Sequence, residues 1–262
     1  MNVRPAAVAG LFYPGETHEL SRMVRDLLAG QKAGTSPPKA LIVPHAGYIY
    51  SGPTAAMGFA QLAKAPLRRI VLFGPAHRVP FRGLALPESD HFATPLGLVE
   101  LDEAAMERAS EHPAVLRMDL AHALEHSLEV QLPFLQSVLD TDFRLVPLVV
   151  GDAPAEDVAD VMQMLWGGKE TLILVSSDLS HYLPYERARS IDQATIRKIL
   201  KLAGPIRHDE ACGATGINGL LLAACSLGLE PRLIDYRNSG DTAGDKSQVV
   251  GYASIAFDEV RS

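Results

Sequence analysis

The sequence lacks the features that mark secreted, membrane-spanning and nucleic-acid-binding proteins. It has only two cysteines, Cys212 and Cys225, so we expect no disulfide framework and a reducing, cytoplasmic environment. No apolar run approaches the ~20 residues that cross a bilayer, which predicts no membrane partner. The formal net charge of −7 argues against a nucleic-acid backbone or an anionic membrane surface as the main partner.

The composition and the pattern of apolar residues predict one α/β domain. Hydrophobic residues make up 47% and charged residues 21% of the 262 residues, which is a globular balance. Short β-branched runs predict buried strands at Ala40–Val43, Arg69–Phe73, Phe143–Val150, Thr171–Val175, Leu233–Tyr236 and Gln248–Phe257. Segments with helical spacing lie between most of them, at Thr17–Leu28, Ala155–Leu165 and Tyr185–Leu202. This alternation predicts a single domain over residues 1–262, with a mainly parallel central sheet flanked by helices.

Three of the predicted strands run into residues that bind metals or move protons. His45 follows the strand at 40–43, His77 follows the strand at 69–73, and Asp178 and His181 follow the strand at 171–175. Ligands of open α/β sheets bind beyond the carboxyl ends of the strands, so neighbouring strands ~5 Å apart would bring these side chains into one pocket. The alternative is that each histidine is a capping or surface residue, as a single histidine after a strand typically is. The sequence does not establish which strands are neighbours in the sheet.

The spacing of Asp178 and His181 suits a strand end or the first turn of a helix, where both side chains share a face. The pair could act as general acid and base, orient a ligand or bind a metal. The alternative is an aspartate that accepts nearby backbone N–H groups and a solvated histidine.

His126 precedes a predicted amphipathic helix, in which leucines recur with helical spacing at 128, 132, 135 and 139. Pro133 either kinks this helix or marks where its regular part begins. His126 would then lie at the site-facing end of the helix. The alternative is an ordinary polar residue at a helix start.

Cys212 precedes an apolar helix predicted at Ile217–Leu227. Backbone N–H groups at a helix N-terminus lower the pKa of a thiol, which makes Cys212 a candidate ligand or nucleophile. A buried, unreactive thiol is the alternative. Cys225 lies among apolar residues in the middle of the same helix, where we expect core packing.

Short motifs along nearly the whole chain resemble those of the Memo family, whose prokaryotic members are called AmmeMemoRadiSam system protein B. Arg4 and the segment Ala9–Pro14 are similar to its N-terminal signature. The other matching motifs, in chain order, are Pro44–Tyr48, Gly74–His77, Glu125–Ser127, Ser176–His181, Cys212–Gly213 and Ser239–Asp241. Each motif alone is weak, and their combination in the expected order is specific.

The resemblance implies a fold similar to that of class III extradiol dioxygenases, which are non-haem iron enzymes. It maps a metal site onto His45, His77 and Cys212. His181 matches the acid/base histidine of those dioxygenases, with Asp178 close by, and His126 resembles their second pocket histidine. Three aromatic residues would form the substrate-binding rim: Phe12, Tyr48 and Tyr50.

The implied third ligand differs from that of the dioxygenases. Non-haem iron oxygenases typically use two histidines and one carboxylate. The thiolate of Cys212 is softer, which shifts the site toward copper or zinc while still admitting iron. The fold by itself therefore does not supply ring-opening activity.

Three functions fit these residues. The favoured prediction is a metal-binding, redox-active iron or copper protein. The same pocket could instead hold a small molecule or a peptide without turnover, as in an adaptor. A zinc-dependent hydrolase with Asp178 as the base is the third. The resemblance also implies radical-SAM and AMMECR-type protein partners. Asp241 and Asp245 offer further oxygen ligands, although such residues are common in turns.

Overall fold

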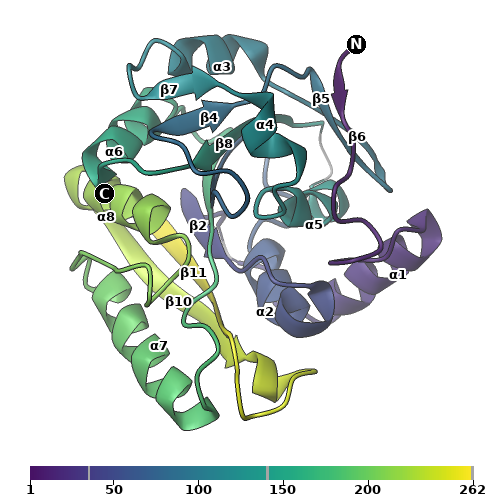
Figure 1. Cartoon of the computed structure of the whole chain (residues 1–262), viewed down its shortest axis with the longest axis vertical. Coiled ribbons are helices and arrows are strands. Elements are labelled where there is room, and N and C mark those ends of the chain that lie inside the picture. The colour runs from purple at the N-terminus through teal and green to yellow at the C-terminus, as the bar shows by residue number, and fades with distance from the viewer. Residues whose placement is uncertain (35, 140–141, 261–262) are drawn as a thin grey trace.

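An eight-stranded mixed sheet forms the centre of the computed structural model (Figure 1). The structure describes residues 1–34, 36–139 and 142–260, so residues 35, 140, 141, 261 and 262 of the predicted domain lie outside the description. The strand order is β10-β11-β2-β9-β3-β8-β4-β7. The strands are β2 Ala40–Val43, β3 Arg69–Pro75, β4 Leu84–Leu86, β7 Val115–Arg117, β8 Arg144–Val150, β9 Thr171–Ser176, β10 Leu229–Asn238 and β11 Gly251–Glu259.

The middle four strands are parallel, as their apolar runs predict. β2 pairs with β9, β9 with β3, and β3 with β8 in parallel register. β2 and β9 are buried along their whole length, because helices cover both faces of this part of the sheet. Val43 pairs with Ser176 and Phe73 pairs with Val175, so β2, β9 and β3 end at the same edge. The strand order that the sequence leaves open therefore brings the strand-end residues together.

The two edges of the sheet correct the prediction of a mainly parallel sheet. β10 and β11 pair antiparallel, because they are consecutive strands without a crossover helix, and β11 is antiparallel to β2. At the other edge β4 is antiparallel to β8 and parallel to β7. A separate three-stranded sheet joins β1 (Val3–Arg4), β5 (His91–Thr94) and β6 (Gly97–Glu100). These short strands are absent from the sequence prediction, because so few residues show no clear periodicity.

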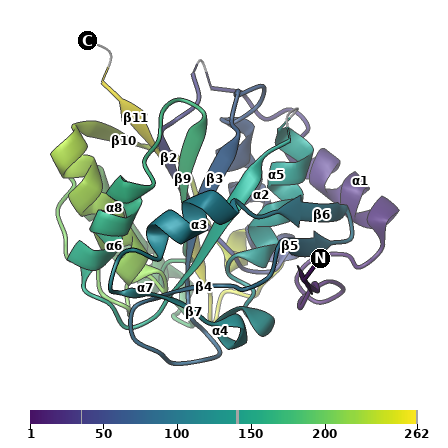
Figure 2. The same cartoon turned by 90° about the horizontal axis from the view of Figure 1, so that it is seen from above.

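Helices lie on both sides of the sheet (Figure 2). α1 (Thr17–Leu28), α2 (Tyr48–Ala60) and α5 (Leu132–Val138) pack together on one side. α6 (Ala155–Met164), α7 (Tyr185–Leu200) and α8 (Ala214–Leu227) lie on the other side, and two shorter helices, α3 (Glu103–Ala109) and α4 (Asp119–Ala123), contact β8 and β4. The helices predicted at 17–28, 155–165 and 185–202 are confirmed, the last two ending at Met164 and Leu200. None of the helices in the described ranges is long and apolar enough to cross a membrane.

Pro133 marks the start of a regular helix. A short 3-10 helix, η1 (Glu129–Gln131), leads directly into α5, and Pro133 lies in the first turn of α5. Proline is tolerated there because its missing N–H would have no partner inside the helix. The buried side chains of Leu132 and Leu135 anchor this segment to the core. His126 therefore lies on the loop before η1 and not inside a long helix.

Candidate metal centre

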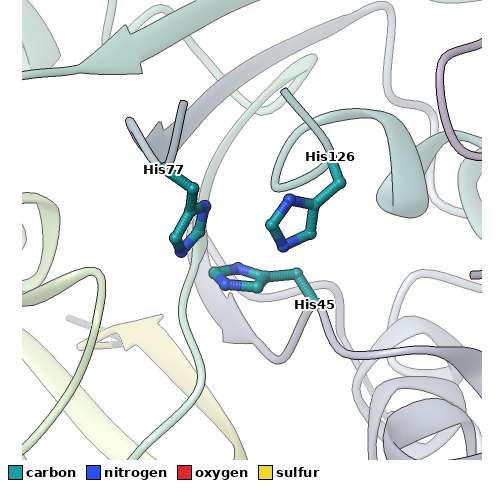
Figure 3. A group of neighbouring side chains, drawn as sticks. All are labelled: His45, His77 and His126. Carbon is teal, nitrogen blue, oxygen red and sulfur yellow. The ribbon is translucent and has the colours of Figure 1, made fainter. Parts of the chain in front are cut away.

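Three histidines from distant parts of the chain come together at the carboxyl edge of the parallel strands (Figure 3). His45 follows β2, His77 follows β3, and His126 lies on the loop between α4 and η1. One ring nitrogen from each lies within 4.8 Å of the others. The ring centroid of His45 is 5.1 Å from that of His77 and 5.4 Å from that of His126, at nearly perpendicular angles. The sequence prediction that strand-end imidazoles lie close together is confirmed for His45 and His77.

The ring of His45 is held in one tautomer by a buried hydroxyl. Ser176 Oγ donates its single proton to the carbonyl of Ser127 at 2.6 Å. It accepts the side-chain amide of Gln131 at 2.8 Å, and His45 Nδ1 lies at the same distance. Because the hydroxyl proton is already used, His45 Nδ1 must carry a proton and donate it. His45 Nε2 is therefore left as a lone pair that faces the site.

The ring of His77 is held by the carboxylate of Glu125. His77 Nδ1 lies 2.9 Å from Glu125 Oε1, and the backbone N–H of His77 donates to Oε2 at 2.6 Å. Oε1 also accepts the backbone N–H groups of His126 and Ser127. Burial opposes the charge on Glu125, but these hydrogen bonds and the charge of His77 prevail and lower its pKa to about 2. An ionised Glu125 accepts the Nδ1–H of His77, so the lone pair of the neutral ring lies on Nε2.

The ring of His126 is held by aromatic contacts. Its centroid lies 4.5 Å from that of His77 in a stacked arrangement and 4.6 Å from that of Phe12. His126 Nδ1 comes within 3.3 Å of Glu125 Oε1 but makes no hydrogen bond. Burial lowers the pKa of His126 to about 4 and that of His45 well below its usual value. Both rings are therefore uncharged near neutral pH, which is the form that binds metals.

Cys212 lies beside His45, one residue before the N-cap of α8. Its Sγ is 3.2 Å from His45 Nε2 and accepts the backbone N–H of Asp178 at 3.3 Å. The expected fall in thiol pKa at the helix start is wrong, because burial and the nearby Asp178 carboxyl raise the pKa of Cys212 to about 12. Cys225 is exposed on α8, so the prediction that it packs in the core is also wrong.

Asp178 and His181 follow β9, but their side chains differ in burial and in their contacts. Asp178 is 4% exposed and its Oδ1 accepts the backbone N–H of His45 at 2.7 Å, which fixes the turn after β2. Burial raises the pKa of Asp178 to about 7. His181 is half-buried, burial lowers its pKa, and it lies close enough to His45 for charges on the two rings to repel. Both residues therefore border the histidine group.

The three aromatic residues predicted for the rim have different positions. Phe12 contacts His126 directly, and Tyr50 is half-buried in the first turn of α2. Tyr48 is 3% exposed, and its hydroxyl donates to the carbonyl of Val130 at 2.6 Å. Its ring packs on Phe134, so Tyr48 is a core residue and the rim prediction is corrected. The start of α2 turns this side chain inward, toward η1 and α5.

A buried ion pair holds the loop that carries Glu125 and His126. Arg4 Nη1 lies 2.6 Å from Glu129 Oε2, and the two side chains are 5% and 0% exposed. Arg4 also donates to the backbone carbonyls of His122 and Glu125. Glu129 in turn accepts two backbone N–H groups of the N-terminal segment. The N-terminus and the loop therefore support each other.

Sequence reasoning missed Glu125, Ser176 and Gln131 as site residues. None of them faces the histidine group as a free ligand, because each is engaged in orienting a neighbour. The one available signal was position, since Glu125 directly precedes His126 and Ser176 is the last residue of β9.

A three-histidine group at the ends of parallel strands is the kind of site found in metalloproteins. The chain matches the Memo-like protein family over residues 4–256. It is 38% identical over 272 residues to a MEMO1 family protein of Aquifex aeolicus, an alignment that covers 98% of this chain and 100% of the relative. It is 33% identical to one from Nitrosopumilus maritimus and 37% identical to one from Methanosarcina barkeri, each covering 97% of this chain and 99% of the relative. The chain belongs to the Memo family.

Proposed function

We propose that the protein binds a first-row transition metal through the Nε2 atoms of His45, His77 and His126. The observation that carries this proposal is the convergence of three imidazoles, two of which bond outward through Nδ1 and, when neutral, keep their lone pair on Nε2. Metal-binding histidines in proteins almost always donate their outer N–H in this way. The buried, uncharged rings of His45 and His126 are also ready to bind without losing a proton.

Cys212 is proposed as an additional ligand. A nitrogen and a sulfur bound to one metal at ~2.1 and ~2.3 Å lie ~3.6 Å apart at a tetrahedral angle. The 3.2 Å between His45 Nε2 and Cys212 Sγ is compatible with one shared ion. A bound metal would stabilise the thiolate against the effect of burial. The ligands implied by the family resemblance, His45, His77 and Cys212, are thus kept, and His126 is added to them.

The proposed metal is iron or copper, and the proposed role is a redox one related to that of class III extradiol dioxygenases. Imidazole nitrogens bind zinc, copper and iron, and a thiolate favours copper and zinc. When bound, iron or copper would supply electron-transfer and oxygen chemistry. Asp178, with a pKa raised to about 7 by burial, and His181 would hold and move protons beside the site. Phe12 and Tyr50 would contact a small substrate.

Metal analysis of the full chain, purified without oxygen, tests the proposal. We expect stoichiometric iron or copper in the wild type, loss of the metal in His45→Ala and His77→Ala, and weaker metal binding in His126→Ala. His18→Ala, on α1, is the matched control and should retain the metal. Protein that takes up neither iron, copper nor zinc would contradict the proposal.

Turnover separates the redox role from hydrolysis. Substrate-dependent oxygen uptake by the iron or copper form, lost in His181→Ala, would support the redox role. Tight zinc with ester or amide turnover that is lost in Asp178→Asn would favour a hydrolase. A metal-loaded protein without either activity would favour the non-catalytic binding role.

The proposed setting is the cytoplasm, where the two free cysteines would stay reduced. The proposed partners are radical-SAM and AMMECR-type proteins, as the family resemblance implies. Affinity purification of the tagged full chain from its native cells should recover such a protein, and a purification without one would count against this part of the proposal.

A further inference from the structure

One buried carboxylate next to the histidine group accepts four hydrogen bonds from the segments that carry the histidines. The Glu125 side chain is 1% exposed. Its Oε1 accepts His77 Nδ1–H and the backbone N–H groups of His126 and Ser127, each at 2.9 Å, and Oε2 accepts the backbone N–H of His77 at 2.6 Å. Three donors therefore fully occupy Oε1, and the fourth occupies one of the two lone pairs of Oε2.

We propose that Glu125 is the positioning residue of the metal centre, which fixes the tautomer of His77 and the separation of His77 from His126. This inference rests on the proposed metal site. Glu125 holds the ring and the backbone of His77 with its two oxygens, so the ring cannot turn without breaking a buried hydrogen bond. The same carboxylate holds the backbone of His126, which belongs to a different segment of the chain.

The orientation of His45 is coupled to this carboxylate through Ser127. The backbone N–H of Ser127 donates to Glu125, and its carbonyl accepts the hydroxyl proton of Ser176. That hydroxyl in turn accepts His45 Nδ1–H. Ser127 Oγ also donates to the carbonyl of Pro75 at the end of β3. One connected set of buried hydrogen bonds therefore reaches all three segments that carry the histidines.

A glutamine at position 125 supplies one oxygen where four donors need two. In either orientation of the amide, its NH2 group would face an N–H donor. With the NH2 group at the position of Oε1, the ring of His77 can accept it only by moving its own proton from Nδ1 to Nε2, which removes the lone pair that the metal needs. The backbone N–H groups of His126 and Ser127 still face the NH2 group in this orientation. Substitutions of such outer partners typically cost 10–100-fold in metal affinity.

Glu129 offers a matched control from the same loop. It is also fully buried, and it also accepts four donors: Arg4 Nη1–H, Tyr13 O–H and the backbone N–H groups of Ala7 and Val8. None of these donors belongs to a histidine. Glu129→Gln therefore creates the same excess of donors without changing a ring tautomer.

Titration of the metal-free full chain with Co²⁺ tests the inference, because the visible spectrum of bound Co²⁺ reports the ligand geometry. We expect Glu125→Gln to weaken Co²⁺ binding ~10–100-fold and to change the spectrum. Glu129→Gln should lower the melting temperature and also weaken Co²⁺ binding through the displaced loop, but it should leave the proton of neutral His77 on Nδ1, whereas Glu125→Gln should move it to Nε2. Wild-type affinity and spectrum in Glu125→Gln, or the same tautomer of His77 in both variants, would overturn the inference.

The tautomer of His77 can be read in the wild type, which covers the case where Glu125→Gln does not fold. Nitrogen NMR of the imidazole rings in the metal-free protein should find the proton of neutral His77 on Nδ1, and a proton on Nε2 would overturn the inference. A wild type with the Nδ1–H tautomer that binds no Co²⁺, Zn²⁺, iron or copper would instead refute the proposed function.

Discussion

The two halves of the histidine group are held in place by different forces. His45 and His77 follow β2 and β3, so the register of parallel strands sets their backbone positions. His126 lies on a loop whose position depends on the buried ion pair of Arg4 and Glu129. The sheet half rests on regular backbone hydrogen bonds and apolar burial. The loop half rests on buried charges that are stable only while they are paired.

This difference predicts where the site is fragile. Loss of one charge on the loop leaves the other charge buried and alone, whereas a change in the sheet half removes one contact among many. Substitutions in the loop half should therefore reduce stability and metal binding together. Substitutions in the sheet half should cost less stability than those in the loop half.

The largest expected effect is that of Arg4→Met. It leaves the Glu129 carboxylate buried without its partner, which should cost about 3–5 kcal/mol of unfolding free energy and weaken metal binding through His126. Denaturant unfolding with a parallel metal titration measures both. Arg144→Met is the control, because its ion pair with Glu100 is more than half exposed and should contribute less than ~1 kcal/mol. Equal losses in the two variants would remove the distinction between the halves.

Asp178→Asn should change how stability depends on pH. Burial raises the pKa of Asp178 from 3.8 to about 7, so folding favours its protonated form. The stability linked to this proton is present in full below the unfolded pKa and is lost as the pH rises through the folded pKa. Between about pH 4 and pH 8, the metal-free wild type should lose stability relative to Asp178→Asn, on the order of a few kcal/mol. The unfolding free energy of both proteins is measured across this pH range. If the two profiles have the same slope, Asp178 is already charged in the folded protein at low pH and the prediction fails.

Ser176→Ala tests the tautomer of His45 in the sheet half. The change leaves the Nδ1–H of His45 and the amide of Gln131 without their acceptor, which should cost ~1–3 kcal/mol. Metal affinity should fall ~10-fold or more, because the ring is no longer held in the required tautomer. Ser137→Ala on α5 removes an exposed hydroxyl that bonds only within its helix, and it should change neither quantity measurably. An unchanged metal affinity in Ser176→Ala would contradict this assignment.

The smallest expected effect is that of Tyr48→Phe, which removes a contact between the two halves. The lost hydrogen bond to the carbonyl of Val130 should cost about 1 kcal/mol in thermal or chemical unfolding. Metal and substrate binding should stay at wild-type levels, since Tyr48 packs in the core. A clear loss of metal or substrate binding would contradict the assignment of Tyr48 to the core and support its predicted place on the pocket rim.

The sheet half was largely predictable from local sequence patterns, whereas His126 was expected near the site mainly through the family resemblance. The apolar runs before His45 and His77 identify buried strands, and ligands of α/β sheets collect at strand ends. The neighbouring order of β2, β9 and β3 depends on how the crossovers pack, which no local pattern specifies. His126 joins the group because Arg4, more than a hundred residues earlier, pairs with Glu129 on the loop. Such a contact has no periodic signal.

The two errors at the site share one physical cause. The helix start predicts a lower pKa for Cys212, but burial outweighs the local dipole and raises it. The family resemblance places Tyr48 on the pocket rim, but the start of α2 directs its side chain into the core. In both cases the tertiary environment, which the sequence does not display, decides the outcome.

X-ray absorption of the metal-loaded protein tests the central claim most directly, because bound imidazoles give a distinctive scattering pattern whose strength reports their number. The account predicts three imidazoles on the metal in the wild type and one fewer in His126→Ala. A spectrum with only two imidazoles that is unchanged in His126→Ala would contradict it.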